Sequence, residues 1–415
     1  AQASWGESPP WVSSDALLAA ILVDAMGCGA SVDESAQLLP LPGPEALPKE
    51  PELDLPLWNA HCKGKLLGQP SKDGLKQWKA RVKAQRTKLF MPGADFTKGD
   101  VLDAVRKQYQ DVQKQMKKVM STIVWAMYSA DLKKEVVDAN EFIGERDCKL
   151  RPDYAYKYDN SELKLLVIKP KKKAAGSMPA IVLAAPISLD NSDVELYDWF
   201  GKVWACSLNA TVILVGFRGY PVADYPAGML DMVAGVKWTH AKASDLGIDS
   251  TRVSLGSQSA GGFVACPAAL ELTARGEAQL LKTVFLESPG LFPDGMLGPY
   301  DGMSEFQQYI WSHPFKAMYI GTAGEDWQAL EARKDPALFV LHAPEDLLRK
   351  APRHVIFCAE FDDLVWAYIE YATRLNACGV LQDFAVVPGA SHNNICAAMI
   401  AGSIPWYVDA AKQQL

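Results

Sequence analysis

The feature of this chain that most limits its fold is a regular alternation of short apolar runs and longer amphipathic stretches between residues 156 and 389. The apolar runs have the length of strands, and the stretches have helical periodicity. We expect strands within 156–170, 180–188, 210–217, 251–257, 281–288, 354–361 and 381–389, and helices within 231–247, 259–276 and 368–379. Strands that alternate with helices pair in parallel through right-handed crossovers. The pattern therefore predicts an α/β fold, with a mostly parallel central sheet that has helices on both faces.

Composition and charge limit the possible partners. The 415 residues are 49% hydrophobic and 22% charged, which is typical of a soluble globular protein. A formal net charge of -7 repels a polyanion, so we expect no nucleic acid partner and a neutral or apolar small molecule instead. The eight cysteines form no C-x-x-C pair, and we expect most of them to be buried in a reducing compartment. No residues have the spacing of metal ligands, so we expect neither a metal nor an organic cofactor.

The first 150 residues differ in character from the rest of the chain. Up to about residue 70 the chain is rich in proline, glycine and acidic residues, which indicates an arm lying on a larger body. From about Asp73 to Val137 apolar residues recur three or four apart, which predicts two amphipathic helices. Acidic residues are interspersed with the basic ones in these helices, so we interpret the charges as solvated helix faces.

One apolar run, residues 15–27, bears on membrane association and compartment. It is too short to span a bilayer and has no basic leader, so we expect a buried or amphipathic helix and no transmembrane segment. The chain begins with Ala1 rather than methionine, and we expect that a leader or tag has been removed. The cytoplasm and an organelle lumen are then the expected compartments, and a monomer or a homodimer the expected assembly.

The motif Ser257-Gln258-Ser259-Ala260-Gly261 lies between a predicted strand and a predicted helix. A sharp strand-to-helix turn can hold a serine ready for nucleophilic attack, and small residues two before and two after it let backbones approach. Gly261 fits this pattern, and Ser257 is small but is not the usual glycine. The alternative is a serine-rich helix cap. The context favours Ser259 as a nucleophile.

A serine nucleophile needs a base within hydrogen-bond reach and a third group that orients the base. His392 lies late in the chain, just beyond a predicted strand, and we predict that it is the general base. His342 and His354 are weaker candidates because neither lies on a loop after a strand. Three carboxylates compete for the orienting role at the end of the preceding strand: Glu360, Asp362 and Asp363.

From about Leu163 to Trp406 the chain resembles the hormone-sensitive-lipase-like branch of the α/β hydrolases, which includes bacterial carboxylesterases, arylacetamide deacetylase and the plant gibberellin receptor. The resemblance rests on residues 215–238, on the segment around Ser259, and on an acid motif and a histidine motif in the family's order. The matching residues are Arg218, Pro221, Pro226, Ala227, Asp231, Trp238, Asp362, Leu364, Pro388, Gly389 and His392. The resemblance implies an α/β-hydrolase fold, with Asp362 as the acid and Asp363 in reserve.

The chain departs from the family pattern in two places, of which the first concerns the oxyanion hole. The family's H-G-G-G motif is replaced by Ala185-Pro186-Ile187-Ser188, and proline has no N–H to donate. The hole is then expected to use the Ala260 amide with the amides of Ile187 or Ser188. Loss of one such donor costs about 10²- to 10³-fold in turnover. Gln258 also stands where the family usually has aspartate.

The resemblance also implies a helical cap over the site. We expect residues 1–150 to form an arm and a cap segment, and residues 151–415 to form the catalytic domain with a cap insertion at about 290–335. The expected function is hydrolysis of a small to medium, apolar acyl ester through an acyl-enzyme. The alternatives are a catalytically weak or inactive ligand-binding receptor on the same fold, or a hydrolase of acyl or C–C bonds in a specialised metabolite.

Overall fold

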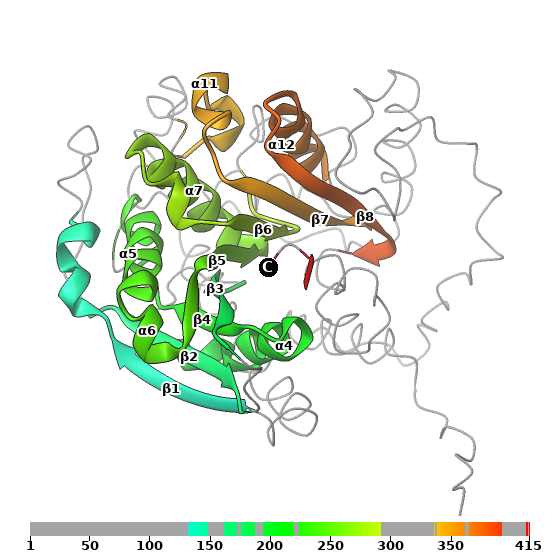
Figure 1. Ribbon diagram of the computed structural model, residues 1–415. Coiled ribbons are helices and arrows are strands. Elements are labelled where there is room, and N and C mark those ends of the chain that lie inside the picture. The colour runs from blue at the N-terminus through cyan, green and yellow to red at the C-terminus, as the bar shows by residue number, and fades with distance from the viewer. Residues whose placement is uncertain are drawn as a thin grey trace, which may run out of the picture.

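The computed structural model describes residues 132–147, 162–171, 176–186, 194–219, 223, 225–291, 336, 338–361, 365–391, 412–413 and 415. Eight strands in these ranges form one sheet, in the order β1-β2-β4-β3-β5-β6-β7-β8 (Figure 1). They are β1 (Leu132–Asp138), β2 (Lys164–Pro170), β3 (Met178–Ala184), β4 (Thr211–Val215), β5 (Ile248–Gln258), β6 (Thr283–Glu287), β7 (Arg353–Phe361) and β8 (Leu381–Ser391). The predicted arm, the predicted N-terminal helical region up to residue 131 and nearly all of the predicted cap insertion lie outside the described residues.

Most of the sheet is parallel, as predicted. Strands β4, β3, β5, β6, β7 and β8 pair in parallel along that order, whereas β1 and β2, and β2 and β4, pair antiparallel. All residues of β4 and β6 are buried, because a strand covered on both faces has no solvent side. Because these strands are parallel, their carboxyl ends lie at the same end of the sheet. Such folds place their reactive groups there.

Strand β1 corrects one prediction. Residues up to Val137 were expected to be helical, but Leu132–Asp138 is a strand at the edge of the sheet, antiparallel to β2. Residues 133–136 are all exposed, so neither face of the strand needs apolar side chains. The sequence here therefore lacks the alternation of apolar and polar residues by which a strand is recognised. Pairing with β2 determines the structure here, and local periodicity does not. The sheet thus begins before residue 150, and the division into arm, cap and catalytic domain stays a prediction.

Helices cover both faces of the sheet (Figure 1). The helices are α4 (Asp198–Leu208), α5 (Ala227–Ala241), α6 (Ala243–Leu246), α7 (Gly262–Ala274), α11 (Glu345–Leu348) and α12 (Val365–Ala377). Short 3₁₀ helices are η2 (Asn140–Arg146), η4 (Val194–Tyr197), η5 (Ser259–Gly261), η6 (Ala278–Leu280) and η7 (Val340–His342). The strands alternate between two apolar cores: Leu165 and Val167 belong to the core with α5, α7 and α12, whereas Leu166 and Ile168 belong to the core with α4.

Helix α4 was not among the predicted elements, although it packs on one face of the sheet. Phe200, Val203 and Trp204 are all buried against that face, in one cluster with β2, β3 and β4. The helix ends at Leu208 and is followed by Asn209, which has a left-handed backbone with φ of 53°. Apolar residues three and four apart in residues 199–208 were the signal that could have identified it.

A buried charge cluster ties the segment after β1 to the body of the sheet. Asp231 of α5 is fully buried, and its carboxylate accepts a hydrogen bond from Nε of Arg146 at 2.7 Å and from Nη2 of Arg218 at 2.8 Å. The backbone N–H of Arg218 also donates to Asp231, at 2.7 Å. A buried carboxylate needs such partners, since the cost of removing it from water is large. Arg218 and Asp231, both part of the family resemblance, are thus in direct contact.

Candidate active site

Ser259 lies where strand β5 meets helix α7. Strand β5 ends at Gln258, Ser259 begins the 3₁₀ helix η5, and α7 starts at Gly262. The φ angle of Ser259 is 49°, in the left-handed region that residues other than glycine rarely adopt. Such a conformation costs about 1–3 kcal/mol and persists only where the surroundings hold it. This is the sharp, strained strand-to-helix turn that the sequence predicted around Ser259.

Small residues around this turn are required by close backbone approach. A Cβ atom on Gly261 would lie 2.6 Å from the carbonyl oxygen of Ala184, at the end of β3. A Cβ atom on Gly262 would lie 2.5 Å from the backbone nitrogen of Gly290, after the end of β6. Ser257, in the position where glycine is usual, is fully buried, and its Oγ has no hydrogen-bond partner among the described residues. The turn is therefore wedged between the ends of β3 and β6.

The predicted base and acid, His392 and Asp362, lie outside the described residues, as does Asp363, but the strands that lead to them are described. Strand β7 ends at Phe361 and β8 ends at Ser391. Phe361 and Ser391 are partners in the register of these parallel strands. Both strands run parallel to β5 and β6, so they end at the same edge of the sheet as Ser259. The assignment of Asp362 and His392 stays a prediction, with backbone topology in its favour.

The predicted oxyanion residues are only partly described. Ala260 is buried in η5, directly after Ser259 and at the start of the turn into α7. Ile187 and Ser188 lie outside the described residues, but Ala185 and Pro186 directly follow β3. The register pairs Ala184 of β3 with Ser257 of β5, so the backbone that leads to Ile187 starts beside the turn. These three residues stay the predicted oxyanion donors.

Another polar contact, between Gln258 and Glu287, lies directly beside Ser259. Gln258 is 4% exposed and Glu287 is fully buried, and Nε2 of Gln258 donates to Oε1 of Glu287 at 2.8 Å. The two residues are the last of β5 and β6 and are register partners. Gln258 was recognised in the sequence as a departure from the family pattern, and Glu287 was not recognised. A carboxylate at the end of an otherwise apolar strand was the signal for it.

The two weaker candidates for the base, His354 and His342, both pack against other residues of the fold. His354 is fully buried within β7, with Nδ1 at 2.8 Å from the Pro352 carbonyl and Nε2 at 3.3 Å from the Tyr371 hydroxyl. Burial lowers the pKa of His354 to about 4, and the Pro352 carbonyl offsets only part of this shift. His342 lies in η7 with its ring edge-on to Phe339. Neither follows a strand at the Ser259 edge, in agreement with the prediction that neither is the base.

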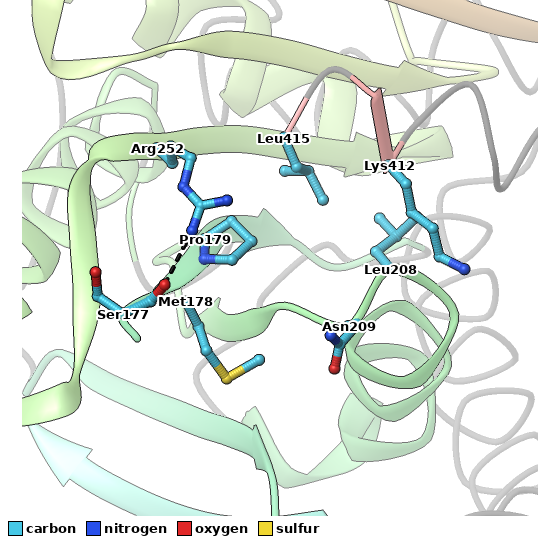
Figure 2. Close-up of a pocket in the computed structure, with 8 residues that line it drawn as sticks. All are labelled: Ser177, Met178, Pro179, Leu208, Asn209, Arg252, Lys412 and Leu415. Atoms are coloured by element: carbon cyan, nitrogen blue, oxygen red, sulfur yellow. Dashed lines mark hydrogen bonds between the residues drawn. The ribbon is translucent and has the colours of Figure 1, made fainter. Parts of the chain in front are cut away.

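A cavity of about 520 Å³ lies at the other end of the sheet (Figure 2). Its lining includes Met178 and Pro179, which begin β3, and Arg252, which lies six residues before the end of β5. Nη2 of Arg252 donates to the Ser177 carbonyl at 2.9 Å. Because β3 and β5 are parallel and Ser259 follows the end of β5, this cavity is remote from the predicted site, and no predicted site residue lines it.

The described residues show neither a metal site nor a membrane-spanning helix. No group of three or more histidine, cysteine, aspartate or glutamate side chains in these ranges is arranged to hold a metal ion. Helices long and apolar enough to cross a bilayer are likewise not found among the described residues. Of the four cysteines described, Cys266 and Cys358 are buried and Cys206 and Cys378 are partly exposed, so the burial of most cysteines stays a prediction.

Comparison with known proteins agrees with this geometry. Residues 191–395 match a family described as alpha/beta hydrolase fold. Ethyl acetate hydrolase from Pseudomonas putida is 27% identical over 211 residues, which cover 50% of this chain and 61% of that protein. Arylesterase from Saccharolobus solfataricus is 23% identical over 181 residues, which cover 43% of this chain and 51% of that protein. The chain thus spans about half to three fifths of the length of these two curated relatives.

Solved structures show the same fold. A bacterial heroin esterase aligns with a TM-score of 0.59 at 22% identity, covering 81% of this chain and 97% of that one. An esterase from the hyperthermophilic archaeon Pyrobaculum calidifontis aligns with a TM-score of 0.57 at 19% identity, covering 81% of this chain and 96% of that one. Its strand order, its strained serine turn and these matches show that the chain has the α/β-hydrolase fold, and residues 191–395 are similar to that family, as the motifs indicated.

Proposed function

We propose that this chain is a serine-dependent carboxylic-ester hydrolase that acts on a small to medium, apolar acyl ester through an acyl-enzyme intermediate. The observation that carries the proposal is the left-handed turn of Ser259 at the sheet edge where β7 and β8 also end. The names of the curated relatives, an ethyl acetate hydrolase and an arylesterase, support the same reaction class. No metal or organic cofactor enters the proposal, and the assembly is a monomer or a homodimer.

In the proposed mechanism the Ser259 hydroxyl attacks the ester carbonyl while His392 takes its proton. His392 then gives this proton to the leaving alcohol, and Asp362 stabilises the imidazolium in between. The Ala260 amide, with the amide of Ile187 or Ser188, stabilises the oxyanion of the tetrahedral intermediate. Water, activated by the same histidine, attacks the acyl-enzyme and releases the acid and Ser259.

The test is covalent labelling of Ser259. A fluorophosphonate probe reacts with an activated serine, so the wild-type protein should be labelled and Ser259→Ala should not, with p-nitrophenyl butyrate hydrolysis reduced by about 10³-fold or more. Ser257→Ala is the matched control: it removes a buried hydroxyl two residues away that has no partner among the described residues, and it should keep both labelling and turnover. Labelling that persists in Ser259→Ala would remove the nucleophile assignment.

Pro186 favours a second candidate function. It stands at the end of β3 without an N–H, where the family has a glycine amide, and a weakened oxyanion hole fits a receptor that binds a small molecule without turning it over. The chain has all three predicted catalytic residues, Ser259, Asp362 and His392, and this favours the enzyme. Butyrate ester turnover that disappears in His392→Ala would decide against the receptor, whereas saturable binding without turnover would decide for it. Hydrolysis of an acyl or C–C bond in a specialised metabolite is the third candidate, and product analysis distinguishes it.

A further inference from the structure

Two neighbouring strands end in the same unusual way at the proposed active site. Strand β5 ends at Gln258, and the next residue, Ser259, has φ of 49°. Strand β6 ends at Glu287, and the next residue, Ser288, has φ of 42°. Among the described residues these two serines and Asn209 are the non-glycine residues with positive φ. The two turns lie side by side because Gln258 and Glu287 are register partners.

Hydrogen bonds join the two turns and continue to the next strand. The amide of Gln258 donates to the carboxylate of Glu287 at 2.8 Å, and the N–H of Gly290 donates to the Ser259 carbonyl at 2.5 Å. The Ser288 N–H in turn donates to the Phe357 carbonyl of β7 at 2.7 Å. Residues 287–290 thus hold the serine turn from one side and contact β7, the strand that leads to Asp362, on the other.

The Gln258 to Glu287 bond lies on the face of the sheet opposite α7. Side chains alternate along a strand, so Gln258 shares a face with Gly256, whose Cβ would meet Trp204 of α4 at 3.5 Å. Glu287 likewise shares a face with Phe285, which belongs to the α4 core. Helix α7 packs on the other face. The turn at Ser259 is therefore held by α7 on one face and by a buried polar bond on the other.

We propose that Glu287 is a positioning residue for Ser259 and acts through Gln258. A buried carboxylate costs free energy unless it is hydrogen-bonded, and a buried amide that loses its acceptor is similarly unfavourable. The pair therefore has a strong preference for the observed register, and this register determines where the following residue, Ser259, begins its turn. The inference rests on the proposed function, since it assigns Glu287 a part in the reaction of Ser259.

The test compares variants that keep the bond with variants that lose it. Glu287→Gln keeps an acceptor for the Gln258 amide and should react with a fluorophosphonate probe within about threefold of the wild-type rate. Glu287→Leu removes the acceptor and should lower both the probe reaction rate and kcat by about 10- to 100-fold, the effect of misplacing a nucleophile by up to 1 Å, with KM within about twofold. Thr283→Val, a polar-to-apolar change at the other end of β6, is the matched control and should keep the wild-type rates.

A reciprocal exchange keeps the test decisive where Glu287→Leu fails to fold. Gln258→Glu alone sets two carboxylates against each other and should lose activity, whereas Gln258→Glu with Glu287→Gln restores one amide and one carboxylate and should recover it. Absence of recovery would overturn the proposal. A loss in Glu287→Gln as large as in Glu287→Leu would also overturn it, because the carboxylate would then act by its charge, as a partner of the catalytic histidine.

The same assays separate this inference from the proposed function. Wild-type turnover that is independent of Ser259 would remove the proposed function and this assignment together. Ser259-dependent turnover in the wild type, with Glu287→Leu at the full rate, would remove the role of Glu287 alone.

Discussion

At the scale of single residues, the turn at Ser259 depends on two positions that have no Cβ atom. Gly261 and Gly262 leave room for the backbones at the ends of β3 and β6, and no other residue leaves this room. The strain at Ser259 persists because these contacts and the bonds to residues 287–290 hold it.

Gly261→Ala tests how tightly the turn is held. The added methyl group would lie 2.6 Å from the Ala184 carbonyl oxygen and 2.9 Å from that of Ala185, so the turn or the end of β3 must move. We expect kcat/KM for p-nitrophenyl butyrate to fall by about 10²-fold, the effect of a displacement of about 1 Å. Gly144→Ala, where the new methyl group meets nothing within 4 Å, is the control and should leave the kinetics unchanged. Equal kinetics in the two variants would show that the turn tolerates the shift.

The sequence predicted the turn at Ser259 but not the contact between Gln258 and Glu287, for a physical reason. The nucleophile turn is local, so five adjacent residues contain its pattern of small side chains around a serine. The role of Glu287 depends on its register opposite Gln258, which is 29 positions away in the chain. No local pattern encodes such a pairing.

At the scale of elements, the strands from β2 to β8 were predictable because each contains a short run rich in apolar residues. Strand β1 was not, because it lies at the edge, its middle residues are exposed, and its structure comes from pairing with β2. Its position is fixed further by Lys134, whose Nζ donates to Asp198 of α4 at 2.8 Å.

The cluster around Asp231 links three elements, so its loss should affect stability rather than catalysis alone. Asp231→Asn removes the charge that two buried arginines share, and we expect unfolding free energy to fall by about 3–5 kcal/mol. Urea denaturation measures the change. Glu345→Gln removes one partner of an exposed ion pair with Arg349 and should change stability by about 1 kcal/mol or less. Similar effects of the two substitutions would contradict the proposed role of the cluster.

At the scale of the whole molecule, His354 makes stability depend on pH. In the folded protein its pKa is lowered from 6.5 to about 4, chiefly by burial, so the unfolded chain takes up a proton at higher pH than the folded protein does. Stability is therefore lost as pH falls from about 6.5 to about 4, by up to roughly 3 kcal/mol from this group. In His354→Asn, which can still donate to the Pro352 carbonyl, urea midpoints should fall less over this range. An unchanged pH profile would show that other groups cause the loss.

The strand order has a practical consequence for anyone who divides this gene. The family match begins at residue 191, after β1, β2 and β3, yet β3 lies between β4 and β5 in the middle of the sheet. A fragment cut at that boundary would lose β3, the strand with which β4 and β5 both pair. The unpaired edges of β4 and β5 would then promote aggregation. Expression of the whole sheet should therefore start upstream of Leu132, so that the carboxylate of Asp231 also keeps Arg146.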